Sequence, residues 1–217
     1  MDIGALTLVV VALAVLATHA VVKAVRQRDD VEGRKARARW AVVLILGLML
    51  AVYVEVGHHQ RQHLATVAMS AVTDNPHATA DCERLTQSLL SARQFTGYVY
   101  QARSDVAFYK YQVCKDVWAY AAGHQDHPSV DQIASVHLIA HETMHVNGIW
   151  NEAEAECKAT QLDYLVAEKL GATPEQAREL QARYFAVLYK YNRSDYVSSE
   201  CREGGEYDIF PDRTEFP

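Results

Sequence analysis

The chain has 217 residues, half of them hydrophobic, and a formal net charge of −6, a length that fits one domain of ordinary size with additional segments. From Glu55 to the end, 14 Lys and Arg stand against 23 Asp and Glu, which gives this part a formal charge of −9. Because binding to phosphates requires a basic face, the composition argues against nucleic acid as a partner.

The first predicted element is a membrane-spanning helix over residues 3–22. This stretch, IGALTLVVVALAVLATHAVV, contains no charged side chain, and its 20 residues are enough to cross a bilayer as a helix. A removed signal peptide is the alternative, but the start MDIG lacks the basic segment that precedes such a signal.

A second apolar run begins at Trp40 and gives a predicted span over residues 40–57. Trp40 and Tyr53 suit the two membrane interfaces, and the run lacks the polar stripe expected of a helix in a soluble core. We therefore expect residues 1–57 to form a two-helix transmembrane hairpin.

The segment between the two runs predicts the orientation. It carries seven Lys and Arg against three Asp and Glu, and short basic loops remain in the cytoplasm. The protein is therefore expected in the cell membrane, in contact with lipid, with everything after the hairpin outside the cytoplasm. The sequence leaves open whether the hairpin also joins copies into a homo-oligomer.

All four cysteines follow the second apolar run: Cys82, Cys114, Cys157 and Cys201. An even number confined to the predicted outer part is typical of disulfides formed in an oxidising compartment. Of three pairings we favour Cys82 with Cys114 and Cys157 with Cys201, because neighbours in sequence often close first. A four-thiolate zinc site is the weaker interpretation, since no C-x-x-C pair is present.

The outer domain, residues 58–217, is predicted to be small and mainly helical, with room for a short sheet (mainly α, or α+β). Its first polar residues continue the second membrane helix until Asn75-Pro76. Apolar spacing then predicts a helix over 79–94. Residues 96–120 are rich in β-formers and aromatics, which indicates a hairpin or short sheet, with helix as the alternative in the second half.

Three further helices are predicted, each introduced by a capping residue: Ser129 to Gly148, Asn151 to Gly171 and Thr173 to Asn192. Ser129 with Gln132, and Asn151 with Glu154, match the capping-box pattern. The tail that follows is predicted to be irregular and held by Cys201.

The first of these helices carries HETMH at residues 141–145. His141 and His145 project from one helical face, one turn apart, so both imidazoles can reach one ion. Glu142 lies about 100° around the helix, where it can take a proton from water that the ion activates. The alternative is a solvated helical face with a satisfied histidine pair, but the apolar ASVHLIA before the motif and the acids after it favour a zinc site.

A third zinc ligand is expected among the glutamates that follow, because catalytic zinc has three protein ligands and one open position. Asn151 stands where a third histidine would continue the spacing, and it is a poor ligand. Glu152 and Glu156 share a helical face, whereas Glu154 points away. This pattern resembles the Asn-Glu-x-x-x-Asp/Glu helix of zinc peptidases with a glutamate ligand, the gluzincins.

The resemblance implies that Glu152 binds the metal and that Glu156 orients His141. The spacing departs from that family, because only six residues separate His145 from Glu152. A tight helical hairpin turning at Gly148 would instead bring Glu156 level with the zinc. Both glutamates therefore remain candidate metal ligands, with Glu152 slightly favoured.

Other polar side chains are expected near the motif. His137 lies one turn before His141 on the same face, which suits a place beside the ligands or in the pocket wall better than a role as a ligand. Tyr189, Tyr191 and Tyr196 are candidates for donating a hydrogen bond to an oxyanion, and the sequence does not choose between them.

A longer pattern, AHETMHVNGIWNEAEAECKATQ with YVSSECREGGEYDIFP, resembles an uncharacterised bacterial family of membrane-anchored or exported proteins. The family pairs H-E-x-x-H-x-x-G with E-x-x-x-E-C-x-A-x-Q and a late E-C-R-x-G-G. The resemblance covers roughly residues 110–217. It implies a metal site and a link between Cys157 and Cys201, without a known substrate.

Together, these patterns predict a membrane-anchored, zincin-like peptidase that uses zinc to cleave a peptide or protein substrate outside the cytoplasm. Two alternatives remain open. One is a non-catalytic domain, zinc-stabilised or metal-free, that binds a partner at the cell surface. The other is a redox or metal sensor built from the cysteines and a metal.

Overall fold

A computed structural model describes the chain in five stretches: residues 5–26, 31–90, 95–123, 125–213 and 216–217. The chain divides into two compact units, Met1–Gln60 and Arg61–Pro217. The boundary between these units lies close to the predicted division after residue 57. The described chain is mainly helical, with one small sheet in the second unit.

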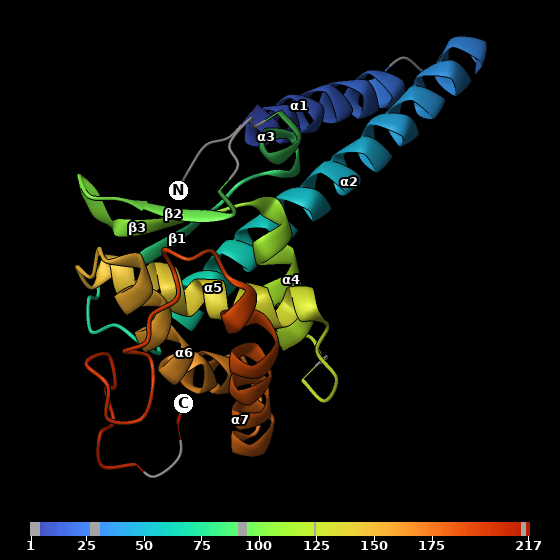
Figure 1. Cartoon of the computed structure of the whole chain (residues 1–217). Coiled ribbons are helices and arrows are strands. Elements are labelled where there is room, and N and C mark those ends of the chain that lie inside the picture. The colour runs from blue at the N-terminus through green and yellow to red at the C-terminus, as the bar shows by residue number, and fades with distance from the viewer. Residues whose placement is uncertain (1–4, 27–30, 91–94, 124, 214–215) are drawn as a thin grey trace. The chain divides into compact units, whose positions relative to one another are not determined.

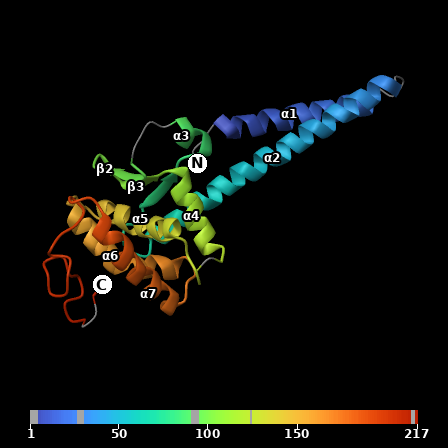
Figure 2. The same cartoon turned by 45° about the vertical axis from the view of Figure 1, so that its right-hand side comes forward.

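The first unit contains α1 (Ala5–Arg26) and the beginning of α2 (Val31–Met69). Within this unit the two helices run side by side in opposite directions (Figures 1 and 2). The hydroxyl of Thr7 donates a hydrogen bond to Oε1 of Glu55 at 2.6 Å and so links them. The predicted hairpin is present as a helix pair, with residues 3 and 4 of the first predicted span outside the described residues.

Two segments of these helices, Thr7–Arg26 and Lys35–Met69, are long and apolar enough to cross a membrane. Only 6% and 17% of their most apolar windows are buried within the chain, whereas a core helix would be mostly buried. Large apolar surfaces of this kind need a cover of lipid or protein. The helices are therefore candidate membrane spans, and the second continues as a helix into the polar segment, as predicted, but ends at Met69, before the predicted end at Asn75-Pro76.

The second unit begins with the end of α2, which a three-stranded sheet in the order β1-β3-β2 follows. β2 (Gly97–Tyr100) and β3 (Arg103–Tyr109) form an antiparallel pair, and β1 (Thr79–Cys82) runs parallel to β3. The hairpin predicted within residues 96–120 is therefore confirmed. The second half of that segment forms the helix α4 (Tyr111–Ala121).

The helix predicted over residues 79–94 is wrong at its start. Thr79–Cys82 is the strand β1, in which Ala80 and Cys82 are buried on one side and pair with residues of β3. This pairing joins segments far apart in sequence and outweighs the local apolar spacing. The helix α3 (Leu85–Leu90) follows, and residues 91–94 lie outside the described residues.

The three C-terminal helices are present as α5 (Val130–Val146), α6 (Glu152–Lys169) and α7 (Pro174–Arg183). The capping box of Ser129 and Gln132 is confirmed, with both hydrogen bonds formed. The second box is only half present. Asn151 accepts from the backbone N–H of Glu154, but the Glu154 carboxylate turns away and pairs with Lys158 at 2.6 Å.

The third predicted helix changes its winding before it ends. Its α-helical part stops at Arg183, then one π-helical turn spans Tyr184–Leu188 and one 3₁₀ turn spans Tyr189–Tyr191. The total length matches the prediction, and the following tail is irregular in the residues described. The altered winding shifts the side chains that approach α5.

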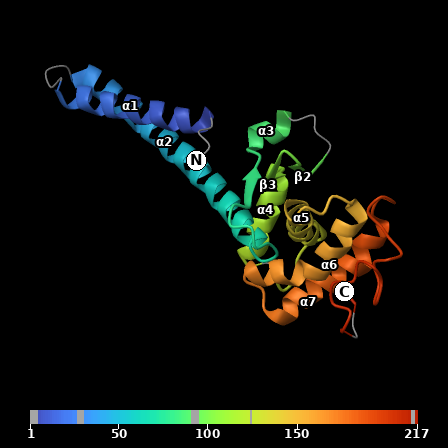
Figure 3. The same cartoon turned by 90° about the vertical axis from the view of Figure 1, so that its left-hand side faces the viewer.

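The core of the second unit lies around α5, which packs between the sheet on one side and α6 on the other (Figure 3). The buried face of α6 is rich in alanine, including Ala155, Ala159 and Ala167. Small side chains allow two helices to approach closely. The polar side chains of α5 and α6 are consequently brought together inside the domain.

Two disulfides tie this unit together. Cys82–Cys114 joins β1 to α4, and Cys157–Cys201 joins α6 to the C-terminal tail. This is the pairing favoured from the sequence, and it accounts for all four cysteines.

Reducing both disulfides should lower the free energy of unfolding of the second unit by about 2–4 kcal/mol per bridge, because each bridge restricts the unfolded chain. Urea unfolding of the full chain in detergent, with and without reductant, measures the change. Mass spectrometry after alkylation without reduction should find no free thiol. Four alkylated cysteines in the native protein would contradict this prediction.

Candidate metal centre

Three donor atoms from α5 and α6 converge on one point. Oε2 of Glu152 lies 3.2 Å from Nε2 of His141 and 3.3 Å from Nε2 of His145. Tetrahedral zinc ligands at about 2.0–2.1 Å from the ion are separated from one another by about 3.3 Å. The three side chains are therefore spaced so that they could hold one metal ion.

A tight turn between the two helices produces this convergence. Gly148 has a φ of 89°, a left-handed conformation that favours glycine, and it follows the last turn of α5. The next residue accepts a hydrogen bond at its carbonyl oxygen from Nδ1 of His145 at 2.7 Å. A helical hairpin turning at Gly148 is thus present, but it brings Glu152, at the first position of α6, to both histidines, whereas the sequence led us to expect Glu156 there from such a turn.

The remaining imidazole nitrogen faces a second glutamate. Nδ1 of His141 lies 2.9 Å from Oε2 of Glu156, although the approach is too bent for a straight hydrogen bond. A carboxylate in this position favours the proton on Nδ1 and leaves the Nε2 lone pair free for an ion. His145 has the same arrangement through its bond to the backbone.

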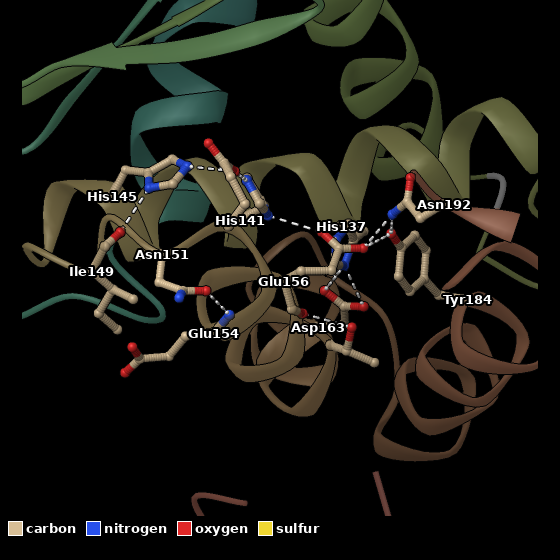
Figure 4. Close-up of polar contacts among 12 residues, drawn as sticks. His137, His141, His145, Ile149, Asn151, Glu154, Glu156, Asp163, Tyr184 and Asn192 are labelled. Atoms are coloured by element: carbon tan, nitrogen blue, oxygen red, sulfur yellow. Dashed lines mark hydrogen bonds and ion pairs between the residues drawn. The ribbon is translucent and has the colours of Figure 1, made fainter. Parts of the chain in front are cut away.

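Glu156 also contacts His137, whose Nε2 lies 3.0 Å from Oε2 of the glutamate (Figure 4). His137, His141 and Glu156 form a second group of described side chains that can hold a metal ion. Their separations of 2.9 and 3.0 Å are shorter than the spacing of tetrahedral zinc ligands. The geometry thus favours Glu152 as the ligand and Glu156 as the partner of His141.

The histidines of the cluster are protonated because neighbouring carboxylates outweigh the effect of burial. Burial alone would lower the pKa of His141, but its contacts with the Glu152 and Glu156 carboxylates outweigh burial and raise the pKa to about 9. Burial would also lower the pKa of His137, yet the charges of Asp163 and Glu156 raise it to about 10. Without a metal, the buried acids are thus compensated by protonated imidazoles.

Glu142 lies beside this cluster and is only 3% exposed. Burial raises the pKa of its carboxyl group to about 7, and the positive charges of His141 and His145 offset only part of this effect. Its Oε2 has no hydrogen-bond partner among the described residues, which is unusual for a buried carboxylate. A group with a pKa near neutrality and an unused acceptor atom suits a general base.

A cavity of about 710 Å³ opens beside Glu142. Its lining includes His141 and Glu142 of the motif, the apolar side chains Val113, Leu138 and Leu188 from three helical segments, and Tyr196. The cavity is large enough for side chains of a peptide-sized ligand. The buried carboxylate therefore faces a space that a ligand can enter.

Of the three tyrosines considered from the sequence, Tyr196 lies at the candidate centre, where its ring stacks on that of His141 at 5.5 Å. Burial, with the negative charges of Glu152 and Glu142, raises the pKa of Tyr196 to about 12, so its hydroxyl remains a donor at neutral pH. The hydroxyl of Tyr189 instead accepts a hydrogen bond from the backbone N–H of Ser198. Tyr191 is at the cavity rim and is 79% exposed.

Several contributing residues were not found from the sequence. Tyr184 and Asn192 both donate hydrogen bonds to Oε1 of Glu156, the latter at 2.6 Å, and Trp150 stacks on His145. Asp163 contacts Nδ1 of His137 at 3.0 Å. Only Asp163 had a usable signal, because it follows Glu156 by seven residues, two turns along the same helical face.

The backbone of β2 passes directly over the Glu142 carboxylate at Gly97. A Cβ added there would lie 2.6 Å from Oε1 of Glu142 and 3.0 Å from its Cγ. The conformation of this glycine is not left-handed, so the close approach itself explains the absence of a side chain.

Gly97→Ala should therefore displace the Glu142 carboxylate, and any turnover that depends on this carboxylate should fall by about 10- to 100-fold without a change in metal content. The measurements are metal per chain and the rate of the reaction proposed below. Tyr100→Ala, at an exposed position of the same strand, is the control and should retain activity. An active Gly97→Ala variant would argue against the close contact.

Comparisons with known proteins do not extend these observations. No protein-family model, curated protein or solved structure matches the chain. The function must therefore be argued from the geometry of the site.

Proposed function

We propose that this protein is a membrane-anchored, zinc-dependent peptidase that acts outside the cytoplasm. The convergence of His141, His145 and Glu152 beside the buried Glu142 carboxylate carries the proposal. The arrangement combines three ligand atoms, a separate acid–base group and an adjacent cavity, which together are the parts needed for metal-assisted hydrolysis.

The donor set supports zinc in particular. Two imidazole nitrogens and one carboxylate oxygen suit a borderline-soft ion, and three protein ligands leave one position open. When bound, zinc would polarise a substrate carbonyl and lower the pKa of bound water to about 7. The Glu156 carboxylate, itself held by Tyr184 and Asn192, supports His141 from the opposite side of its ring.

The protein's own groups supply the proton transfers. Glu142 takes a proton from the attacking water, with a pKa near 7 that suits both uptake and release. The same carboxyl group then returns the proton to the leaving amine. The Tyr196 hydroxyl, protonated at neutral pH, donates to the oxygen on which negative charge develops.

An extended peptide fits the surroundings of Glu142. β2 lies at one edge of the described sheet, so one side of its backbone is not paired with another described strand. Such an edge can accept a peptide as an additional strand. Gly97 at the start of β2 lies against Glu142, so a peptide added there would place its carbonyl groups near the acid–base group.

The membrane topology is part of the proposal. The basic segment between the helices favours a cytoplasmic loop, and the disulfides favour an oxidising compartment for the second unit. A phosphatase reporter fused after Pro217 should be active outside the cytoplasm, and one inserted near Gly33 should be inactive. The reverse result would contradict the orientation.

Metal analysis and peptide hydrolysis by the full chain in detergent test the proposed function. One zinc per chain is expected, together with cleavage of a quenched fluorogenic peptide library that stops on chelation and returns with added zinc. Zinc without cleavage would favour a zinc-stabilised binding domain. A native chain that binds no zinc would favour a metal-free surface module.

A further inference from the structure

The polar contacts of the candidate centre continue past Glu156 into the core. From the metal-binding histidine inward, carboxylate and imidazole alternate in the order His141, Glu156, His137 and Asp163 (Figure 4). Each adjacent pair has atoms 2.9 to 3.0 Å apart. These four side chains come alternately from α5 and α6, so their contacts also join the two helices that carry the candidate metal ligands.

All four of these side chains are buried, and Asp163 at the inner end of the series is 0% exposed. A route that carried protons to solvent would have to reach the surface, and this one ends in the core. A buried carboxylate without partners is strongly unfavourable, so each acid here must be matched by donors. The arrangement therefore suits a fixed support better than a path for protons.

The support converges on Glu156. Its Oε2 faces His141 and His137, and its Oε1 accepts from Tyr184 and Asn192. His137 is itself fixed on two sides, since its ring stacks on Tyr184 at 3.6 Å and its Nδ1 faces Asp163. With both carboxylate oxygens engaged, the Glu156 side chain has one orientation in which all its partners are satisfied.

We propose that His137 and Asp163 are positioning residues of the metal centre, which hold the Glu156 carboxylate against Nδ1 of His141 and so fix the metal-binding imidazole. The inference rests on the proposed metal centre, and it adds two residues that touch neither the ion nor the substrate. Carboxylates behind a ligating histidine set its orientation and basicity, and their loss typically weakens metal binding by about 10- to 100-fold.

Two variants remove the support with little change in shape. Asp163→Asn is isosteric, and His137→Phe keeps a ring that can stack on Tyr184. Each should weaken zinc binding about tenfold in the full chain, measured by competition with a chromophoric chelator. The visible absorption of the cobalt-substituted protein should also shift, because the ligand field depends on how His141 is held.

A double-mutant comparison separates positioning from general stability. If both residues act through Glu156, adding Asp163→Asn to Glu156→Gln should change zinc affinity by less than about twofold. Thr160→Val is the matched control, because Thr160 is buried on α6 between these acids and its hydroxyl donates to the backbone oxygen of Glu156, not to a carboxylate. It should leave zinc affinity and the cobalt spectrum unchanged.

Parent-like zinc affinity and cobalt absorption in Asp163→Asn would overturn the inference while leaving the metal centre intact. An equal loss of affinity with and without Glu156→Gln would also overturn it, because the residues would then act independently. If His137→Phe fails to fold, Asp163→Asn alone decides the outcome. A parent chain that binds no metal would remove both the centre and its support.

Discussion

Glu142→Gln is expected to lower turnover by about two orders of magnitude or more while zinc stays bound. The amide keeps the shape of the buried side chain but cannot take up a proton at neutral pH. The carboxylate lies beside the convergent ligands without being one of them, so its loss should spare the metal. The turnover rate on a cleaved peptide, with zinc per chain determined on the same sample, is the measurement.

Glu154→Gln provides the matched control for this experiment. Glu154 lies at the start of α6 near the candidate ligands, but its carboxylate pairs with Lys158 and takes no part in the metal cluster. Its variant should keep both zinc and turnover. A Glu142→Gln protein as active as the parent would exclude Glu142 as the base, and one that loses zinc would assign Glu142 to the metal site itself.

Glu152→Ala should remove most of the bound zinc, whereas Glu156→Ala should weaken zinc binding only about 10- to 100-fold. The difference follows from geometry, because Glu152 faces Nε2 of both motif histidines and Glu156 faces Nδ1 of His141. Dissociation constants from chelator competition, followed by turnover at saturating zinc, measure both effects.

The opposite order would exchange the two roles. If Glu156→Ala abolishes binding and Glu152→Ala spares it, the ion lies in the second group with His137 and His141. Glu154→Ala should leave affinity at the parent level and cost only about 0.3–0.5 kcal/mol of stability, since it removes one ion pair four residues apart on a helix. Equal zinc affinity in all three variants would mean that HETMH is not a metal site here.

Local signals made the helices of the outer domain predictable. Ser129 with Gln132, and Thr173 with Pro174, mark helix starts through contacts within one turn, and Gly148 and Gly171 mark the ends through a left-handed backbone. Such contacts depend little on the rest of the fold. The capping box at Asn151 failed in part because Lys158, one turn further on, offered Glu154 a better partner.

The strand β1 could not be predicted from local sequence. Its four residues carry no strong pattern of their own, and they are extended because β3, more than 20 residues later, pairs with them. The disulfide from Cys82 to Cys114 fixes the same region from α4. The stabilising contacts are non-local, so the apolar spacing of residues 79–94 pointed to a helix instead.

The residues of the candidate site also fall into those that local sequence predicts and those that depend on contacts between distant segments. His141, His145 and Glu142 could be placed from helical periodicity alone, because their relative positions depend on one helix. The choice between Glu152 and Glu156 depended on the turn at Gly148 and on the distance between α5 and α6, which no spacing rule contains. Tyr184 and Asn192 reach Glu156 from the π-helical turn after α7 and from the residue after the following 3₁₀ turn, a change of winding that no periodicity rule predicts.

The Cys157–Cys201 link bears on when the candidate centre can form during production of the protein. The segment between α7 and Cys201 carries Asn192 and Tyr196, which contact Glu156 and His141. Before oxidation, only non-covalent contacts hold this segment in place. Until Cys157 and Cys201 are oxidised, a newly made chain therefore lacks the covalent bond that secures one wall of the candidate centre. The assembly of this centre is thus coupled to the redox state of the compartment in which the second unit folds.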